Sequence, residues 1–200
     1  MYLPKIREIK EALGSLFSSP YTSRYPKGTF TPAKEYRGFP SYNNEYCIGC
    51  GACAQVCPAN AIEVIDDKMN KTRTLRLNYS SCIQCGQCQE KCITGKGIEQ
   101  TDKYSIPLMA LDSPEKYDII VKELAICECC AEVIAPRDHL IWIRDRLGVK
   151  AFSHPNFMLE TQRLFFTLEN SEPKDELRRE DYMKEVCPKC RHNIVVKDEF

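Results

Sequence analysis

Residues 47–58, "CIGCGACAQVCP", and residues 82–93, "CIQCGQCQEKCI", contain the same arrangement of four cysteines. Both have the form C-x2-C-x2-C-x3-C, and each cysteine of the first run recurs 35 positions later in the second. A run of this kind supplies three thiolates from one loop to a [4Fe–4S] cluster, while its fourth cysteine binds the neighbouring cluster. The repeat therefore predicts two [4Fe–4S] clusters with crossed ligands.

This spacing divides eight cysteines into two sets. The first cysteine set, for cluster 1, is Cys47, Cys50, Cys53 and Cys92, and the second cysteine set, for cluster 2, is Cys82, Cys85, Cys88 and Cys57. Two zinc sites or buried structural thiols are the alternatives, but zinc needs two pairs of thiolates and does not explain runs of four. About fifty residues with few large apolar side chains could hardly bury a sufficient core alone, so we expect the clusters to form it.

The two runs differ after their last cysteine. Pro58 follows Cys57, as the motif expects, whereas Ile93 follows Cys92. The ligand is retained in both runs, but the loop after Cys92 is free to take another course. We therefore do not expect equal reduction potentials for the two clusters.

Five further cysteines lie in the C-terminal half: Cys127, Cys129, Cys130, Cys187 and Cys190. Residues 187–190, "CPKC", form a C-x2-C knuckle, and only Cys127 with Cys130 has matching spacing upstream. Four thiolates suit tetrahedral Zn²⁺ or a single iron, and we favour Zn²⁺ in a structural role. The alternatives are unliganded cysteines in a small core, or His192 replacing one thiolate. Cys129 would be the thiol outside this tail cysteine set, which is Cys127, Cys130, Cys187 and Cys190.

Composition restricts the class of protein. The chain has 200 residues, 28 basic and 28 acidic, which argues against a general nucleic-acid or anionic-lipid binder. No apolar run is long enough to cross a bilayer, and the charged start is unlike a cleaved signal peptide. Thirteen cysteines without an export signal indicate a reducing compartment, where clustered thiols bind metal rather than form disulfides.

The rest of the chain shows helical and strand patterns. Residues 1–17 have apolar side chains at spacings of three and four, which predicts an amphipathic helix, and the proline-containing residues 18–44 predict an extended arm. Residues 61–66 and 72–78 predict a β-hairpin, and short helical turns are expected at 53–57 and 88–92. Pro136 and Gly148 bound a predicted helix. The charged residues 170–181 predict a solvated helix or loop.

We therefore predict an α+β fold, with a two-cluster bacterial ferredoxin-like core, an N-terminal amphipathic helix and arm, and a C-terminal metal-knuckle tail. The expected domains are residues 1–44 for the docking helix and arm, 45–104 for the 2×[4Fe–4S] ferredoxin domain, and 105–200 for a tail with a four-cysteine, zinc-ribbon-like site. The apolar face of the N-terminal helix packs on the protein itself or on a partner. Its mixed charges favour a protein partner over a membrane surface.

Residues 19–62 resemble the chain-I type ferredoxin subunit of respiratory complex I. The resemblance lies in Thr22–Pro26, in the "YRG" step at Tyr36–Gly38, and in "CIGCGACAQVCPANAI" at Cys47–Ile62. It implies a relay between peripheral and membrane-proximal clusters, docked at the membrane arm. Residues 124–147 with "CPKCR" at 187–191 are similar to the iron–sulfur subunit of formate hydrogenlyase and group 4 membrane-bound [NiFe]-hydrogenases.

The resulting hypothesis is a non-catalytic electron-relay subunit of a membrane-bound [NiFe]-hydrogenase or formate hydrogenlyase-type complex. The alternatives are the same relay in an NADH- or ferredoxin-driven quinone oxidoreductase, a soluble ferredoxin carrier, and a scaffold without redox function. Residues 47–98 hold six basic and four acidic residues, unlike the usual small acidic carriers. The expected partners are a small iron–sulfur subunit and a membrane-arm subunit. The expected location is the cytoplasmic side of the cell membrane, reached through these partners.

Overall fold

The computed structural model describes residues 5–19, 31–106, 113–168 and 178–196. The chain divides into two compact units, Met1–Tyr36 and Arg37–Phe200. The Thr22–Pro26 segment of the resemblance lies outside the described residues, as does most of the charged stretch at 170–181.

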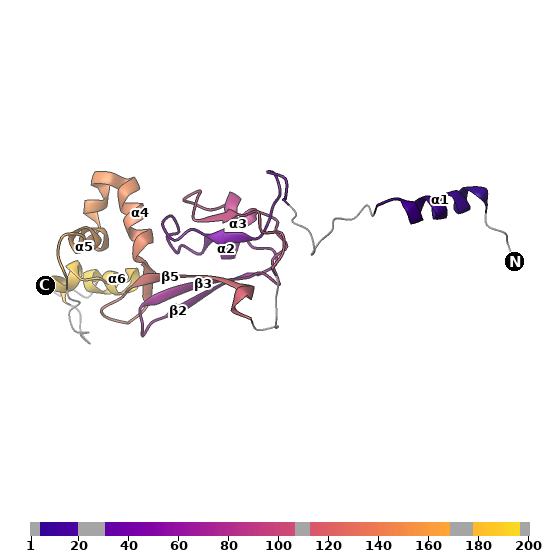
Figure 1. Ribbon diagram of the computed structural model, residues 1–200. Helices are drawn as coiled ribbons and strands as arrows, with labels where there is room; N and C mark the ends of the chain where they lie inside the picture. Colours follow the sequence, from indigo (N-terminus) through magenta and orange to yellow (C-terminus); the bar gives the residue numbers. More distant parts are fainter. Residues whose placement is uncertain (1–4, 20–30, 107–112, 169–177, 197–200) are drawn as a thin grey trace. The chain divides into compact units, whose positions relative to one another are not determined.

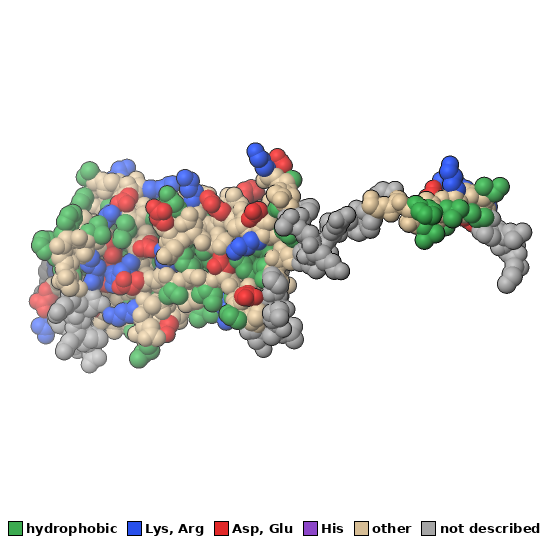
Figure 2. Space-filling view, in the orientation of Figure 1, with side chains coloured by type: hydrophobic (Ala, Val, Ile, Leu, Met, Phe, Trp, Pro, Cys, Tyr) green, Lys and Arg blue, Asp and Glu red, His purple; other side chains and the backbone are tan. Residues whose placement is uncertain are grey.

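The first unit contains one helix, α1 (Ile6–Phe17), where the apolar spacing predicts it. The backbone N–H of Lys5 donates to the Glu8 carboxylate over 3.0 Å, which satisfies a donor at the start of the helix. No residue of α1 is buried, and Ile6 and Phe17 are 87% and 89% exposed. Figure 2 shows its apolar side chains along one side of the helix and its basic ones on the other. The apolar face of α1 is therefore exposed.

The second unit is built on a four-stranded antiparallel sheet with the order β2-β3-β5-β6. Strands β2 (Ile62–Asp67) and β3 (Thr72–Asn78) form the predicted hairpin, with Ile62 opposite Leu77 and Val64 opposite Leu75. Strand β5 (Tyr117–Ile126) pairs with β3, and β6 (Val133–Pro136) pairs with β5. A separate pair joins β1 (Pro40–Tyr42) to β4 (Ile98–Gln100).

Two short helices, α2 (Ala52–Gln55) and α3 (Gln87–Glu90), lie over one face of this sheet (Figure 1). Each begins one residue before the third cysteine of its run, because Gly51 and Gly86 precede them with left-handed φ angles of +77° and +79°. Glycine takes such angles without the steric cost that a Cβ brings. The core between the helices and the sheet consists of cysteines and apolar side chains: Cys47, Cys53, Cys88, Ala61, Ile62, Leu75, Leu77, Tyr79, Ile98 and Ile120.

The tail continues from the sheet as helices (Figure 1). Helix α4 (Arg137–Leu147) begins after Pro136 and ends before Gly148, which confirms the predicted limits. It is followed by the 3₁₀ helix η2 (Gly148–Ser153), α5 (Pro155–Arg163), the 3₁₀ helix η3 (Arg179–Met183) and α6 (Pro188–Val196). A further 3₁₀ turn, η1 (Pro114–Lys116), leads into β5.

The strands cross both domain limits drawn from the sequence. Strand β1 lies within the expected arm but pairs with β4, so the compact unit already begins at Arg37. Strand β5 lies in the expected tail but pairs with β3 along seven residue pairs, from Thr72–Glu123 to Asn78–Tyr117. The dicluster region and the tail therefore share one sheet.

Candidate iron–sulfur and tail metal sites

The first cysteine set surrounds one cavity. Cys47, Cys50 and Cys53 reach it from the loop and helix of the first run, and Cys92 reaches it from beyond α3. Its apolar wall comes from the sheet and from β4, through Leu75 and Ile98. The four thiols that the spacing groups for cluster 1 thus line the same space.

The second cysteine set surrounds another cavity. Cys82, Cys85 and Cys88 belong to the second run, and Cys57 arrives from the end of the first. Pro40, Ile62 and Leu77 complete the apolar wall. Helices α2 and α3 contact each other, so the two cavities belong to one core.

Polar hydrogens already point at the sulfur atoms. The Ala61 N–H donates to Cys57 Sγ over 3.2 Å, and the Gln84 N–H donates to Cys82 Sγ over 3.4 Å. Cys92 Sγ lies 3.3 Å from Thr94 Oγ1. Donors of this kind stabilise thiolates and tune the potentials of iron–sulfur clusters.

Bare thiols in these places would remain protonated. Burial raises the pKa of Cys53 to about 12 and that of Cys88 to about 11, so the apolar surroundings disfavour isolated thiolates. A bound metal centre reverses this preference, because a coordinated thiol is deprotonated outright. Burial also raises the pKa of Tyr42, whose hydroxyl lies beside Cys53.

The Tyr42 hydroxyl supplies a direct test of fit. Its oxygen is buried and has no well-formed hydrogen bond to any described residue, although Tyr42 lines the first cavity. Buried hydroxyls without a partner are rare in folded proteins. Sets of four thiols, apolar walls, donors aimed at sulfur and an unpaired hydroxyl together fit [4Fe–4S] clusters.

Strand β5 brings a cation to the first cysteine set. The Lys122 ammonium donates to the Asn44 carbonyl over 2.9 Å and pairs with Asp138 at 2.9 Å. Burial raises the pKa of the Cys47 thiol, and the nearby charge of Lys122 counteracts this shift. Sequence reasoning missed Lys122, because only the long-range pairing of β5 with β3 places it there.

The tail cysteine set forms a third site. The Sγ atoms of Cys127, Cys130, Cys187 and Cys190 all lie within 4.8 Å of one another, with Cys130 and Cys187 3.7 Å apart. Cys127 ends β5, and the other pair begins α6. This is the set that the matching C-x2-C spacings group together, and it could hold a metal ion.

The two side chains weighed beside this set lie at its edge. Cys129 packs against the small core around the four cysteines, and His192 is exposed. Although burial raises the pKa of Cys127, the backbone N–H groups of Cys130, Cys187 and Cys129 outweigh it and lower the value to about 7. The loop is thus arranged to stabilise a thiolate at Cys127.

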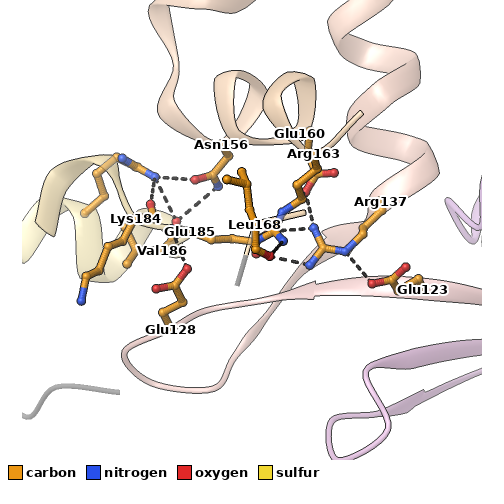
Figure 3. Close-up of polar contacts among 11 residues, drawn as sticks. Glu123, Glu128, Arg137, Asn156, Glu160, Arg163, Leu168, Lys184, Glu185 and Val186 are labelled. Carbon is orange, nitrogen blue, oxygen red and sulfur yellow. Dashed lines mark hydrogen bonds and ion pairs between the residues drawn. The ribbon is translucent and has the colours of Figure 1, made fainter. Parts of the chain in front are cut away.

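A buried polar network adjoins the tail site, and no sequence pattern predicted it. Arg137, at the start of α4, hydrogen-bonds Glu160, Glu185 and Glu123, and the first two carboxylate side chains are only 2% and 1% exposed (Figure 3). Arg163 donates to Glu185 over 3.1 Å. Burial raises the pKa of Glu160 to about 7, although Arg137 acts in the opposite direction.

A second branch of the network reaches the tail cysteines (Figure 3). Arg191, which follows Cys190, donates to Asn156 over 2.5 Å, and Asn156 donates to the Val186 carbonyl over 3.3 Å. The backbone N–H of Glu128 donates to the Glu185 carbonyl over 2.9 Å. These bonds connect both cysteine knuckles to α5.

Comparison with known proteins identifies the class of the central region. Residues 46–96 match the family described as "4Fe-4S dicluster domain". This region contains both C-x2-C-x2-C-x3-C runs and both cysteine-lined cavities. The ferredoxin-like character of the core is therefore shown, together with its iron–sulfur cofactors.

Relatives of the chain are subunits of larger complexes. It is 39% identical over 78 residues to NADH-quinone oxidoreductase subunit I of Helicobacter hepaticus, covering 36% of this chain and 37% of that protein. It is 46% identical over 46 residues to formate hydrogenlyase subunit 6 of Escherichia coli, covering 23% and 26%. These matches confirm the resemblance stated from the sequence. The chain spans less than half the length of these curated relatives.

One solved structure also aligns with part of the chain. A chain of "the membrane-bound sulfane sulfur reductase (MBS), an archaeal respiratory membrane complex" is 29% identical, with 55% of this chain and 59% of that chain covered. The TM-score is 0.40, which is too low to carry a conclusion about the fold. Within the described residues, none of the helices has the length and apolar character needed to span a bilayer.

Proposed function

We propose that this chain is an electron-relay subunit of a membrane-bound oxidoreductase complex of the [NiFe]-hydrogenase or formate hydrogenlyase type. The observation that carries the proposal is the pair of four-cysteine cavities within one core. Two neighbouring [4Fe–4S] clusters would pass single electrons between the partners on either side of the subunit. The chain has the role of a conductor and carries out no substrate chemistry of its own.

In this proposal the protein holds the clusters and excludes water from them. The first cysteine set binds cluster 1 and the second binds cluster 2, so each run contributes a ligand to the other cluster. Leu75 and Ile98 cover the first cavity, and Ile62 and Leu77 cover the second. A dry environment makes the nearby charges and hydrogen bonds more effective in setting the potentials.

The tail site has a structural role in the proposal. The tail cysteine set would bind one Zn²⁺, because four thiolates at one point suit a closed tetrahedral site. Its two knuckles are separated by about sixty residues, so a bound ion closes a long segment of chain. A single iron is the alternative ion.

Helix α1 would dock on a partner subunit. Its apolar side is exposed and its opposite side carries mixed charges, which suits a groove on another protein. The partners would include a small iron–sulfur subunit and a membrane-arm subunit. The chain would then lie peripherally on the cytoplasmic side of the membrane, without a bilayer span of its own.

Affinity purification from the source cells tests this function. We expect a tagged chain to be recovered from solubilised membranes together with a [NiFe] large subunit. Recovery with a quinone-site subunit instead would favour a chain-I type relay in an NADH- or ferredoxin-driven quinone oxidoreductase. Recovery of the chain alone, in the soluble fraction and with both clusters, would contradict the proposal and favour a diffusing ferredoxin.

A further inference from the structure

Tyr42 is the last residue of β1 and lies five positions before Cys47. Its ring lines the first cavity, and its hydroxyl lies beside Cys53. The oxygen is buried without a well-formed hydrogen bond to any described residue. Neither the cysteine motif nor the match to the dicluster domain, which begins at residue 46, assigns a role to it.

The internal repeat provides a comparison within the same molecule. The position five residues before Cys82 is Leu77, which lies 35 residues after Tyr42, the offset of the cysteine repeat. Leu77 lines the second cavity as Tyr42 lines the first. One cavity therefore has a hydroxyl where the other has only an alkyl side chain.

The position of Tyr42 is fixed by its backbone. Its N–H donates to the Asp118 carboxylate over 2.8 Å, and its strand partner is Ile98, which also lines the cavity. Asp118 itself is held in β5, opposite Leu77 of β3. The sheet thus holds the phenol against the cysteines, where a sulfur atom is the acceptor within reach.

We propose that the Tyr42 hydroxyl donates a hydrogen bond to the Cys53 thiolate that binds cluster 1, and thereby raises the reduction potential of that cluster. This inference rests on the proposed cluster ligation. A donor to the sulfur withdraws negative charge, and the reduced cluster carries one more electron than the oxidised cluster, so the reduced form gains more from the bond. Cluster 2 receives no such bond at Leu77, so the two potentials differ in part because of this one side chain.

The experiment uses the full chain with both clusters, compared with Tyr42→Phe, which removes the hydroxyl and keeps the ring. Redox titration followed by EPR should show a lower midpoint potential for one cluster and an unchanged potential for the other. The control is Tyr79→Phe, because the Tyr79 hydroxyl lies beside Ser41 and Asp118, which can serve as its partners. The control should leave both potentials unchanged.

Resonance Raman spectroscopy gives an independent readout on the unmodified chain. An Fe–S(Cys) stretching band should shift between H₂O and D₂O, and the shift should be smaller in Tyr42→Phe. Two intact clusters with unchanged potentials in Tyr42→Phe would overturn the inference, and so would a solvent-independent band in the unmodified chain. A chain with fewer than two clusters would instead overturn the proposed function, and the inference with it.

Discussion

Gly38 shows how closely single residues are constrained next to the first cysteine set. Its N–H donates to the Thr101 carbonyl over 3.0 Å, just before β1 pairs with β4. A Cβ at Gly38 would lie 2.3 Å from the Thr101 oxygen and 2.6 Å from the Lys103 oxygen. Both atoms belong to the backbone and cannot turn away. The "YRG" step of the resemblance therefore has a steric reason at its glycine.

We expect Gly38→Ala to displace β1 from β4 and to destabilise the cluster-bound protein by about 1–3 kcal/mol or more, because the backbone must move. The measurement is the rate at which the iron–sulfur absorbance is lost in guanidinium chloride, which should increase. Gly14→Ala in α1 is the control, since nothing lies within 4 Å of its added methyl group. Equal rates for Gly38→Ala and the unmodified chain would show that the junction tolerates a side chain.

The cysteines of the tail permit a second prediction at this scale. Because Cys130 Sγ lies within 4.8 Å of the other three thiols of its set, Cys130→Ser should lose the zinc ion, measured by metal analysis. Cys129→Ser should retain it, since Cys129 only packs at the edge of the site. Neither substitution should alter the EPR signals of the clusters. Zinc lost from Cys129→Ser and kept by Cys130→Ser would mean that the pairing of the knuckles is wrong.

At the residue scale, spacing predicts ligands but not the side chains around them. The repeat and the C-x2-C knuckles grouped twelve cysteines into sets that each line one site. Tyr42, Lys122 and the Arg137 network carry no local signal. Their positions depend on which strands pair, and this pairing is not encoded in short spacing patterns.

At the scale of elements, local signals were sufficient for the hairpin and for α4. The turn residues between β2 and β3, and Pro136 and Gly148 around α4, mark these elements within the chain itself. Strand β5 has no such mark, and its partner β3 lies about forty residues earlier in the chain, a separation at which loop closure opposes pairing. We expected a domain limit where the structure has a shared sheet.

The start of α4 permits a prediction about the buried network. Arg137→Met should leave Glu160 and Glu185 without their main cation, and removing one partner of a buried ion pair costs about 3–5 kcal/mol. We expect a lower guanidinium midpoint for unfolding of the zinc-loaded tail, followed by the fluorescence of Trp142, the chain's one tryptophan. The cluster EPR signals should remain.

The loss should be smaller at pH 6 than at pH 8. The pKa of Glu160 is raised to about 7, so its protonated form favours the folded state at low pH, and this contribution is lost as the pH rises through that value. The control is Lys68→Met, which removes an exposed pair with Glu132 and should cost about 0–1 kcal/mol. Equal midpoints for Arg137→Met and Lys68→Met would contradict a stabilising network.

At the scale of the whole molecule, the division after Tyr36 separates α1 from the cluster-binding unit. Deleting residues 1–17 should therefore leave both clusters spectroscopically intact while releasing the chain from its complex during membrane purification. Leu13→Ser with Leu16→Ser should have the same effect through the apolar face, and Lys10→Ser on the polar face should not. Loss of the clusters after the deletion would show that α1 supports the core.

The account depends most on two clusters that share ligands across the repeat. Cys57→Ser and Cys92→Ser remove the last cysteine of each run, so EPR of the two reduced proteins compares equivalent changes. We predict that Cys57→Ser alters the cluster bound by Cys82, Cys85 and Cys88, whose selective loss in Cys85→Ser identifies its signal. Cys92→Ser should alter the other cluster. If Cys57→Ser instead changed the signal that survives in Cys85→Ser, and Cys92→Ser changed the signal lost there, the crossed arrangement would be contradicted.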